Sequence, residues 1–144
     1  LVHTIIITHN NLGPEGLKII AASSSLPKVD YLHLGSNNLG DEGLETLASC
    51  DLFSEVKTLN LEQNGITERG AKALARSSAL TQLTSLNMVD NRIGDQGALA
   101  IANSDTLSNL TYLHLGGNRI KTEEAKAALR ESKKLTQLKT LKVF

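Results

Sequence analysis

One asparagine recurs along this chain of 144 residues at a fixed interval of 27 residues. Its five copies are Asn10, Asn37, Asn64, Asn91 and Asn118. Self-similarity at a period of this length is typical of repeat architectures, in which each unit packs mainly on its neighbours. The interval therefore restricts the chain to a stacked array of similar units.

Each asparagine ends a short phrase with the pattern L-x-x-L-x-L-x-x-N, in which Val, Ile or Met also occupy the apolar places. The full phrases are VHTIIITHN, VDYLHLGSN, VKTLNLEQN, LTSLNMVDN and LTYLHLGGN, and a partial sixth, LKTLKVF, ends the chain. Apolar residues alternate with other residues in the middle of each phrase. This period of two predicts a short strand with one buried face.

A second recurring segment follows each asparagine and is typical of a helix start. Its copies read GPEG, GDEG, TERG, GDQG and KTEE. Pro14 suits the first helical turn, where a missing N–H costs little. Asp41, Thr67, Asp95 and Thr122 are predicted N-caps, and neighbouring acids complement the helix dipole. Apolar residues at helical spacing come next, so each unit is predicted to be a strand, a turn and a helix.

Stacked units of this kind bury a shared core that one unit alone cannot bury. Parallel strands lie about 4.8 Å apart and helices are about 10 Å across, so the stack has to bend with its strands inside. We predict an α/β solenoid with a parallel β-sheet on the concave face and α-helices on the convex face. We expect a single domain, 1–144, with repeats at 2–28, 29–55, 56–82, 83–109 and 110–137 and a terminal strand at 138–144.

The two ends of the array depart from the pattern. The first strand has no polar cap of the kind repeat arrays need, so exposed Ile5 and Ile7 edges would indicate repeats or a domain upstream. The fifth repeat has KTEE in place of GDEG and is one residue longer. We expect it to act as a C-terminal cap, with Leu141, Val143 and Phe144 closing the core.

The five copies resemble leucine-rich repeats, and their strand-plus-full-helix unit is similar to the ribonuclease-inhibitor-like class. The resemblance covers the chain from Val2 to Phe144. It implies that the recurring asparagines hydrogen-bond backbone groups of the turn. The short period and wording such as LTQLTSLN resemble repeats of bacterial proteins, including effectors of intracellular bacteria. A protein of this kind would act in the cytoplasm or, after secretion by a bacterium, in the cytosol of a host cell.

The exposed places of the strand phrase are the positions that the repeat leaves free for function. Both tyrosines and all four histidines fall within these phrases. A face with Tyr, His, amides and acids is typical of a protein-binding surface with aromatic anchors. The competing interpretation is that exposed strands favour Tyr, Thr and His for β-propensity alone. The predicted partner-binding residues are Tyr31, His33, Asn60, Glu62, Asn87, Asp90, Tyr112 and His114.

The sequence therefore predicts a monomeric interaction module that binds a protein partner through a rigid concave face. The resemblance to the ribonuclease-inhibitor-like class implies an inhibitor or regulator, acting for example on an enzyme whose active site it covers. One alternative is a GTPase-activator-like catalytic accessory, with Arg92 or Arg119 acting in trans. A second alternative is a structural repeat segment of a larger protein.

Other classes of function find little support in the residues. His33 and His114 are three strands apart, about 14 Å, which is too far for a shared metal ion, and we expect no metal and no cofactor. Cys50 takes the place that serines hold in other repeats, and the recurring acids read as helix caps. We therefore expect no catalytic residues and no enzyme activity. The single cysteine favours a reducing compartment.

The distribution of charge narrows the class of partner. Net charge is zero, and no apolar run approaches the roughly 20 residues that span a bilayer, so neither a membrane nor specific nucleic acid is expected. Residues 119–144 hold eight Lys or Arg against three Glu, whereas residues 1–118 hold seven basic and twelve acidic residues. The basic end would steer a protein partner. The centre of the concave face instead carries Asp30, Glu62 and Asp90, opposed only by Lys57.

Overall fold

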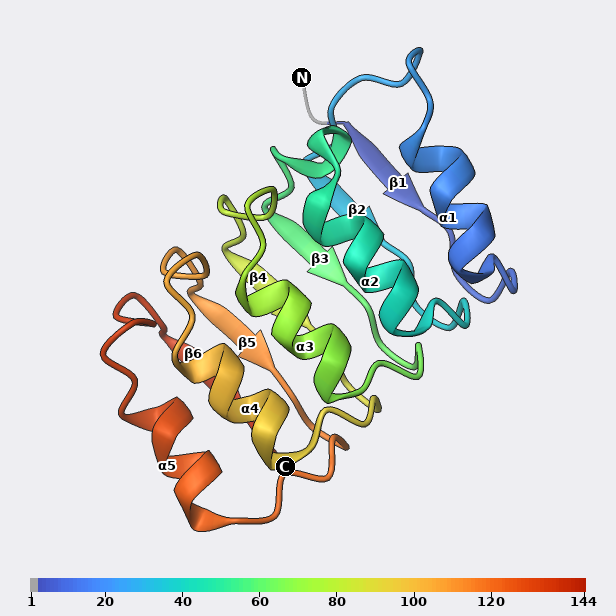
Figure 1. Cartoon of the computed structure of the whole chain (residues 1–144). Helices are drawn as coiled ribbons and strands as arrows, with labels where there is room; N and C mark the ends of the chain where they lie inside the picture. The colour runs from blue at the N-terminus through green and yellow to red at the C-terminus, as the bar shows by residue number, and fades with distance from the viewer. Residues whose placement is uncertain (1–2) are drawn as a thin grey trace.

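Strands and helices alternate along a curved stack in the computed structural model, which describes residues 3–144 (Figure 1). Within these residues one parallel sheet holds six strands in chain order: β1 (Thr4–Ile6), β2 (Tyr31–His33), β3 (Thr58–Asn60), β4 (Ser85–Asn87), β5 (Tyr112–His114) and β6 (Thr140–Lys142). The helices of the same residues are α1 (Gly13–Ala21), α2 (Gly40–Ser49), α3 (Glu68–Ala75), α4 (Gly94–Ala102) and α5 (Glu123–Arg130). The predicted α/β solenoid is confirmed.

The register of the sheet follows the sequence period. Tyr31 pairs with Thr58 of the next strand, and Tyr112 pairs with Ser85 of the preceding one. Across the one-residue insertion, Tyr112 pairs with Thr140. Equivalent places of all six phrases therefore form continuous rows across the sheet. The middle residue of each strand, such as Leu59, points into the core, and its two neighbours lie on the opposite, concave face.

The core between the sheet and the helices is built almost entirely from Leu, Ile, Val and Ala. The exceptions include Met88, and Phe53, whose ring is fully buried in a short 3-10 helix, η1 (Asp51–Phe53). This helix was not predicted, since the strand and helix pattern carries no signal for it. One and two periods later, the buried Leu80 and Leu107 take the corresponding place.

The recurring asparagines join neighbouring repeats as well as closing their own turns. Asn37, Asn64, Asn91 and Asn118 are buried, whereas Asn10 is exposed. The Asn64 amide donates to the carbonyls of Leu61 and Glu62 in its own turn and to that of Leu34 in the preceding repeat. Its Oδ1 accepts from the backbone N–H groups of Asn37 and Leu39. The side chain thus satisfies turn groups that the short strands leave unpaired.

A second row of small side chains ties the helix ends together. The hydroxyls of Ser77 and Ser104 donate to the carbonyls of Ala48 and Ala75 in the preceding repeats, each at 2.6 Å. Cys50 takes the same place, with its sulfur 3.5 Å from the Ala21 carbonyl oxygen. The structure therefore gives the Cys50 side chain a place in the scaffold.

The helix starts differ in part from the prediction. Pro14 lies in the first turn of α1, and Thr67 and Thr122 cap α3 and α5, as predicted. The prediction that Asp41 and Asp95 cap their own helices is wrong. Gly40 and Gly94 adopt positive φ angles of 62° and 65° and already begin α2 and α4, so each aspartate falls within the first helical turn.

These two aspartates instead reach the following repeat. Asp41 Oδ1 accepts from the N–H groups of Thr67 and Gly70, at 2.7 and 3.0 Å. Asp95 Oδ1 accepts from the N–H groups of Lys121 and Thr122, at 2.7 and 3.1 Å. The backbone hydrogen bonds from Thr122 and Lys121 lower the pKa of the Asp95 carboxyl below its ordinary value. The acids therefore link repeats rather than closing one.

The ends of the stack also differ from the expectation. Ile5 and Ile7 are half-buried against the core, and the neighbouring Ile6 is 61% exposed. Leu141 and Val143 pack on the core, but the expectation that Phe144 does so is wrong, because it is 85% exposed. The predicted start of the first repeat, at residue 2, lies outside the described residues.

Candidate protein-binding face

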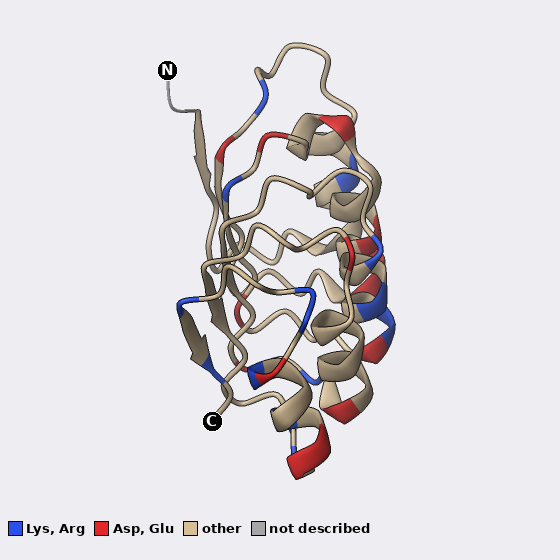
Figure 2. Ribbon diagram, turned by 90° about the vertical axis from the view of Figure 1, so that its left-hand side faces the viewer, with Lys and Arg blue, Asp and Glu red and all other residues tan. Residues whose placement is uncertain are grey.

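The sheet and the helices form two layers that are seen edge on in Figure 2. Most of the ribbon coloured for charged residues lies in the helical layer, and the sheet carries little of it. The eight predicted contact residues all belong to the strands or to the turns that follow them. The structure divides them into a polar centre, an aromatic C-terminal cluster and the separate Tyr31.

The polar centre spans three neighbouring repeats. His33 Nε2 on β2 lies 3.6 Å from Glu62 Oε1, and the Asn87 amide on β4 donates to Glu62 Oε2 at 3.4 Å. Asn60 is placed differently, because its side-chain oxygen accepts from the Glu62 N–H at 3.0 Å. Asn60 thus shapes the strand end that presents Glu62. The Glu62 carboxylate therefore lies between side chains of β2 and β4 and accepts a hydrogen bond from Asn87.

A second polar row lies at the ends of the same strands. The Ser36 hydroxyl donates to Gln63 Oε1 at 3.0 Å, and the Gln63 amide donates to Asp90 Oδ2 at 3.4 Å. All three residues have positive φ angles, between 51° and 57°, which turn their side chains into one line. Ser36 and Gln63 were missed as site residues. Gln63 lies one period and Ser36 two periods before Asp90, and this spacing is the signal that would have found them.

The C-terminal cluster combines aromatic rings with a cation. The ring of His114 lies 6.4 Å from the ring of Tyr112 and 6.4 Å from that of Phe144, centroid to centroid. Lys142 Nζ lies 5.8 Å from the centroid of the Tyr112 ring, within the range of a cation–π contact. Lys142 and Phe144 were not among the predicted contacts. The register of β6, which places Lys142 beside His114, was the available signal for the lysine.

Tyr31 stands apart from both groups. It lies on β2, three strands away from Tyr112 on β5, and is 36% exposed. Over residues 3–144 its ring makes no aromatic or cation–π contact. The two tyrosines therefore lie on either side of the polar centre rather than together.

His114 is electrostatically disfavoured as a cation. Burial lowers its pKa below the ordinary value of 6.5, Lys142 lowers it further, and Asp90 acts in the opposite direction. Its Nδ1 accepts the Gly116 N–H at 3.2 Å. The imidazole is therefore neutral near pH 7 and carries its proton on Nε2.

The variant Lys142→Gln is expected to raise the pKa of His114 towards its ordinary value, because it removes a neighbouring positive charge. Because the pKa of His114 in the folded state lies below its ordinary value of 6.5, protonation favours the unfolded state. The stability associated with neutral His114 is therefore present above pH 6.5 and is lost as pH falls through the folded-state pKa. An NMR titration of the imidazole signals measures the shift. Lys126→Gln, on α5, is the control and should leave His114 unchanged. A His114 pKa unaffected by Lys142→Gln would contradict this account.

The chain belongs to the leucine-rich repeat family. The model described as Leucine Rich repeat matches residues 2–21, 25–48, 56–75, 79–102 and 106–127. Leucine-rich repeats generally mediate protein–protein interaction. Among curated proteins no relative of this chain was found. Among solved structures, the chain is similar to the tropomodulin C-terminal domain from Caenorhabditis elegans, with a TM-score of 0.66 and 16% identity over 94% of this chain and 83% of that chain. At this identity the likeness shows the fold alone.

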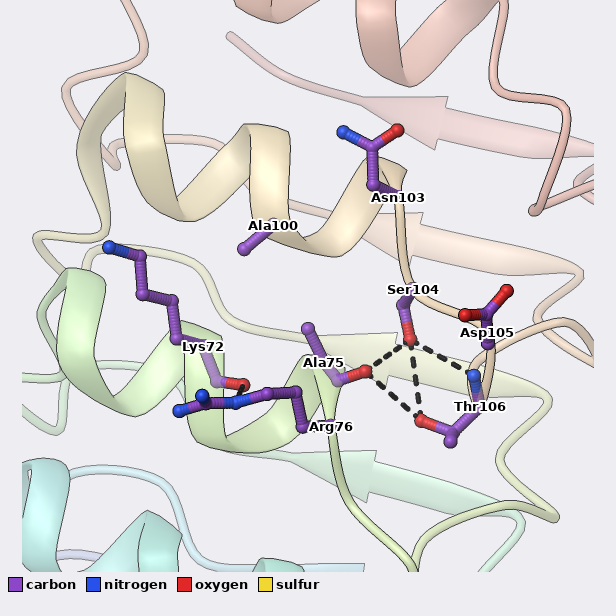
Figure 3. A pocket seen from close by; sticks show the side chains of 8 residues that line it. All are labelled: Lys72, Ala75, Arg76, Ala100, Asn103, Ser104, Asp105 and Thr106. Carbon is purple, nitrogen blue, oxygen red and sulfur yellow. Dashed lines mark hydrogen bonds between the residues drawn. The ribbon is translucent and has the colours of Figure 1, made fainter.

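A hollow of about 320 Å³ lies between the C-terminal ends of α3 and α4 (Figure 3). Its polar groups already have partners within the chain. Arg76 Nε donates to the Lys72 carbonyl, and the Ser104 and Thr106 hydroxyls both donate to the Ala75 carbonyl. These bonds complete the end of α3, so the hollow is explained by the scaffold. None of the described helices, moreover, has the length and apolar character needed to cross a membrane.

Proposed function

We propose that this protein binds a protein partner through the concave face of its sheet. One observation carries the proposal. Over residues 3–144, every ion pair between Lys or Arg and a carboxylate lies on the helices or their connecting loops, and none lies on the concave face. The convex side neutralises much of its own charge, whereas within residues 3–144 the concave acids Glu62 and Asp90 form no ion pair with Lys or Arg.

The contacts of the concave face suit a preformed binding surface. Glu62 and Asp90 are oriented by the amides of Asn87 and Gln63, so docking costs little side-chain entropy. Exposed apolar or aromatic groups flank them, with Tyr31 on one side and Phe144 on the other. Large aromatic side chains around a polar centre are typical of energetically important interface residues.

More specific roles extend this proposal. The ribonuclease-inhibitor-like unit suits a monomeric inhibitor or regulator that covers an enzyme's active site. The resemblance to bacterial effector repeats suits action in the cytoplasm, or in a host cytosol after secretion. For the GTPase-activator alternative, Arg92 and Arg119 are exposed in the turns after β4 and β5. Stimulated GTP hydrolysis that is lost in Arg92→Ala would favour that alternative.

Affinity capture read by mass spectrometry tests the proposed face. The bait is the wild-type chain beside a triple variant, Tyr31→Ala, Glu62→Ala, Tyr112→Ala. A matched control carries Ile19→Ala, Glu45→Ala and Arg69→Ala on the helices. We expect a partner that wild type and control capture and that the folded concave variant loses. A partner retained by the concave variant and lost by the helical control would move the binding site to the convex side.

A further inference from the structure

The carboxylates of Glu62 and Asp90 on the concave face each have one oxygen that accepts a side-chain hydrogen bond and one that accepts none from the described residues. The Asn87 amide occupies Glu62 Oε2, and the Gln63 amide occupies Asp90 Oδ2. Glu62 Oε1 lies 3.6 Å from His33 Nε2. That ring nitrogen is buried and has no hydrogen-bond partner within residues 3–144. The amides therefore orient both carboxylates without neutralising them.

Two glycines keep the free oxygens open. A Cβ atom on Gly117 would lie 2.1 Å from Asp90 Oδ1, and one on Gly35 would lie 3.1 Å from Glu62 Oε1. The backbone alone does not demand glycine at 117, because Ser36, Gln63 and Asp90 occupy the same place in other repeats with positive φ. The missing side chain at 117 therefore leaves room in front of the Asp90 carboxylate.

We infer that the partner of the concave face presents a cationic side chain, Arg or Lys, to Glu62 and Asp90. The inference rests on the proposed function and adds the chemistry of the partner. A guanidinium or ammonium group supplies charge-assisted hydrogen bonds to carboxylates, and here both carboxylates are already oriented. A phosphate backbone would meet like charge at the same place, so an acidic nucleic acid is the wrong occupant.

The distribution of charge along the sheet also indicates where the cationic side chain of the partner would bind. Lys142 and the aromatic cluster occupy the β5–β6 end, where a second positive charge would be repelled. The carboxylates lie at the ends of β3 and β4, and no Lys or Arg in the described part of the chain pairs with them. The cation therefore belongs over β3 and β4, with aromatic or acidic groups of the partner towards Tyr112 and Lys142.

Selection from a phage-displayed library of random dodecapeptides tests this inference. The targets are the wild-type chain, the double variant Glu62→Gln, Asp90→Asn, and the variant Ser85→Trp, which places a bulky ring on the concave face of β4. A convex double variant, Glu45→Gln, Asp105→Asn, is the matched charge control. Circular dichroism checks that each variant is folded. Selected peptides are then made as free peptides and their affinities measured by calorimetry.

We expect wild type and the convex control to enrich peptides with a common Arg or Lys, and the concave double variant to bind them about tenfold more weakly or worse. If the selected peptides lack Arg and Lys but lose binding to Ser85→Trp, the inferred cation is wrong and the concave face remains the binding site. Peptides that all variants bind equally would contradict both the inference and the proposed function. The absence of any enriched peptide counts against the inference.

Gly117 and Gly65 offer a sharper pair of variants. Gly117→Ala is expected to displace Asp90 and weaken a selected cationic peptide several-fold. Gly65→Ala has the same backbone strain, with φ of 68° against 71°, but its Cβ would meet nothing within 4 Å. It should therefore leave binding unchanged. If the two alanine variants bind the cationic peptide with equal affinity, the open space at Gly117 has no role in binding.

Discussion

Replacing Asn64 with alanine is expected to lower the free energy of unfolding by about 3–5 kcal/mol. The side chain is 1% exposed and forms five hydrogen bonds with backbone groups of two repeats. Alanine leaves the N–H groups of Asn37 and Leu39 without this acceptor, and each buried unpaired group costs about 1–3 kcal/mol. The three carbonyls each lose one of two donors. Single domains have only about 5–15 kcal/mol of stability, so this one change removes a large share of it. Urea unfolding followed by circular dichroism measures the loss.

Asn10→Ala is the matched control for this prediction. Asn10 has the same place in the first repeat, but it is exposed, and within the described residues its amide donates only to the Thr8 carbonyl. Its removal should cost less than about 1 kcal/mol. Similar losses for Asn10→Ala and Asn64→Ala would show that burial of the inter-repeat hydrogen bonds does not control the effect.

Replacing Phe53 with alanine is expected to cost about 3–5 kcal/mol by creating a cavity. Phe53 is the largest fully buried side chain, with 0% exposure, and it packs in the loop between α2 and β3. The cavity would open next to the core shared by the second and third repeats. Equilibrium unfolding in urea gives the change in stability, and an unchanged slope with denaturant would confirm a comparable folded state.

Phe53→Leu separates the size of the ring from the presence of an apolar group. Leucine is the natural residue at the corresponding places, Leu80 and Leu107, which are also fully buried. We expect a loss of about 1 kcal/mol, because most of the buried apolar volume is kept. A loss equal to that of Phe53→Ala would mean that the loop of the second repeat requires an aromatic ring and cannot relax around leucine.

Much of the fold could be predicted because it depends on rows of residues with one spacing. A short strand such as the one centred on Leu59 and a following helix such as α3 recur in each of the five repeats, so one correct assignment applies to the others. Features specific to one repeat were missed. The 3-10 helix that buries Phe53 occurs in the second repeat, and nothing in the period indicates it.

The two aspartate caps show a different limit. Asp41 and Asp95 follow a glycine, and the sequence pattern alone does not reveal that this glycine has a positive φ and already belongs to the helix. The resulting shift of one residue turns each aspartate towards the next repeat. Contacts between repeats depend on such small displacements, which a linear pattern does not record.

The sequence predicted which face of the sheet carries the candidate site, but not which side chains contact one another on it. Glu62 and Asp90 were identified, yet the amides that orient them were not recognised as partners, because Gln63 and Asp90 meet across a full period of 27 residues. Phe144 was assigned to the core because the atypical fifth repeat was expected to end in a C-terminal cap. Its side chain is instead exposed to solvent and lies beside His114.

Covalent footprinting by hydroxyl radicals tests the central claim, binding through the concave face, most directly. The sample is the chain alone and in complex with the partner that affinity capture identifies. Tyr31 and Tyr112 report on the concave face, and Ile19, which is 76% exposed on α1, reports on the convex side. We expect the complex to protect both tyrosines and to leave Ile19 as reactive as in the free chain. Protection of Ile19 with unchanged tyrosines would place the partner on the helices and contradict the account.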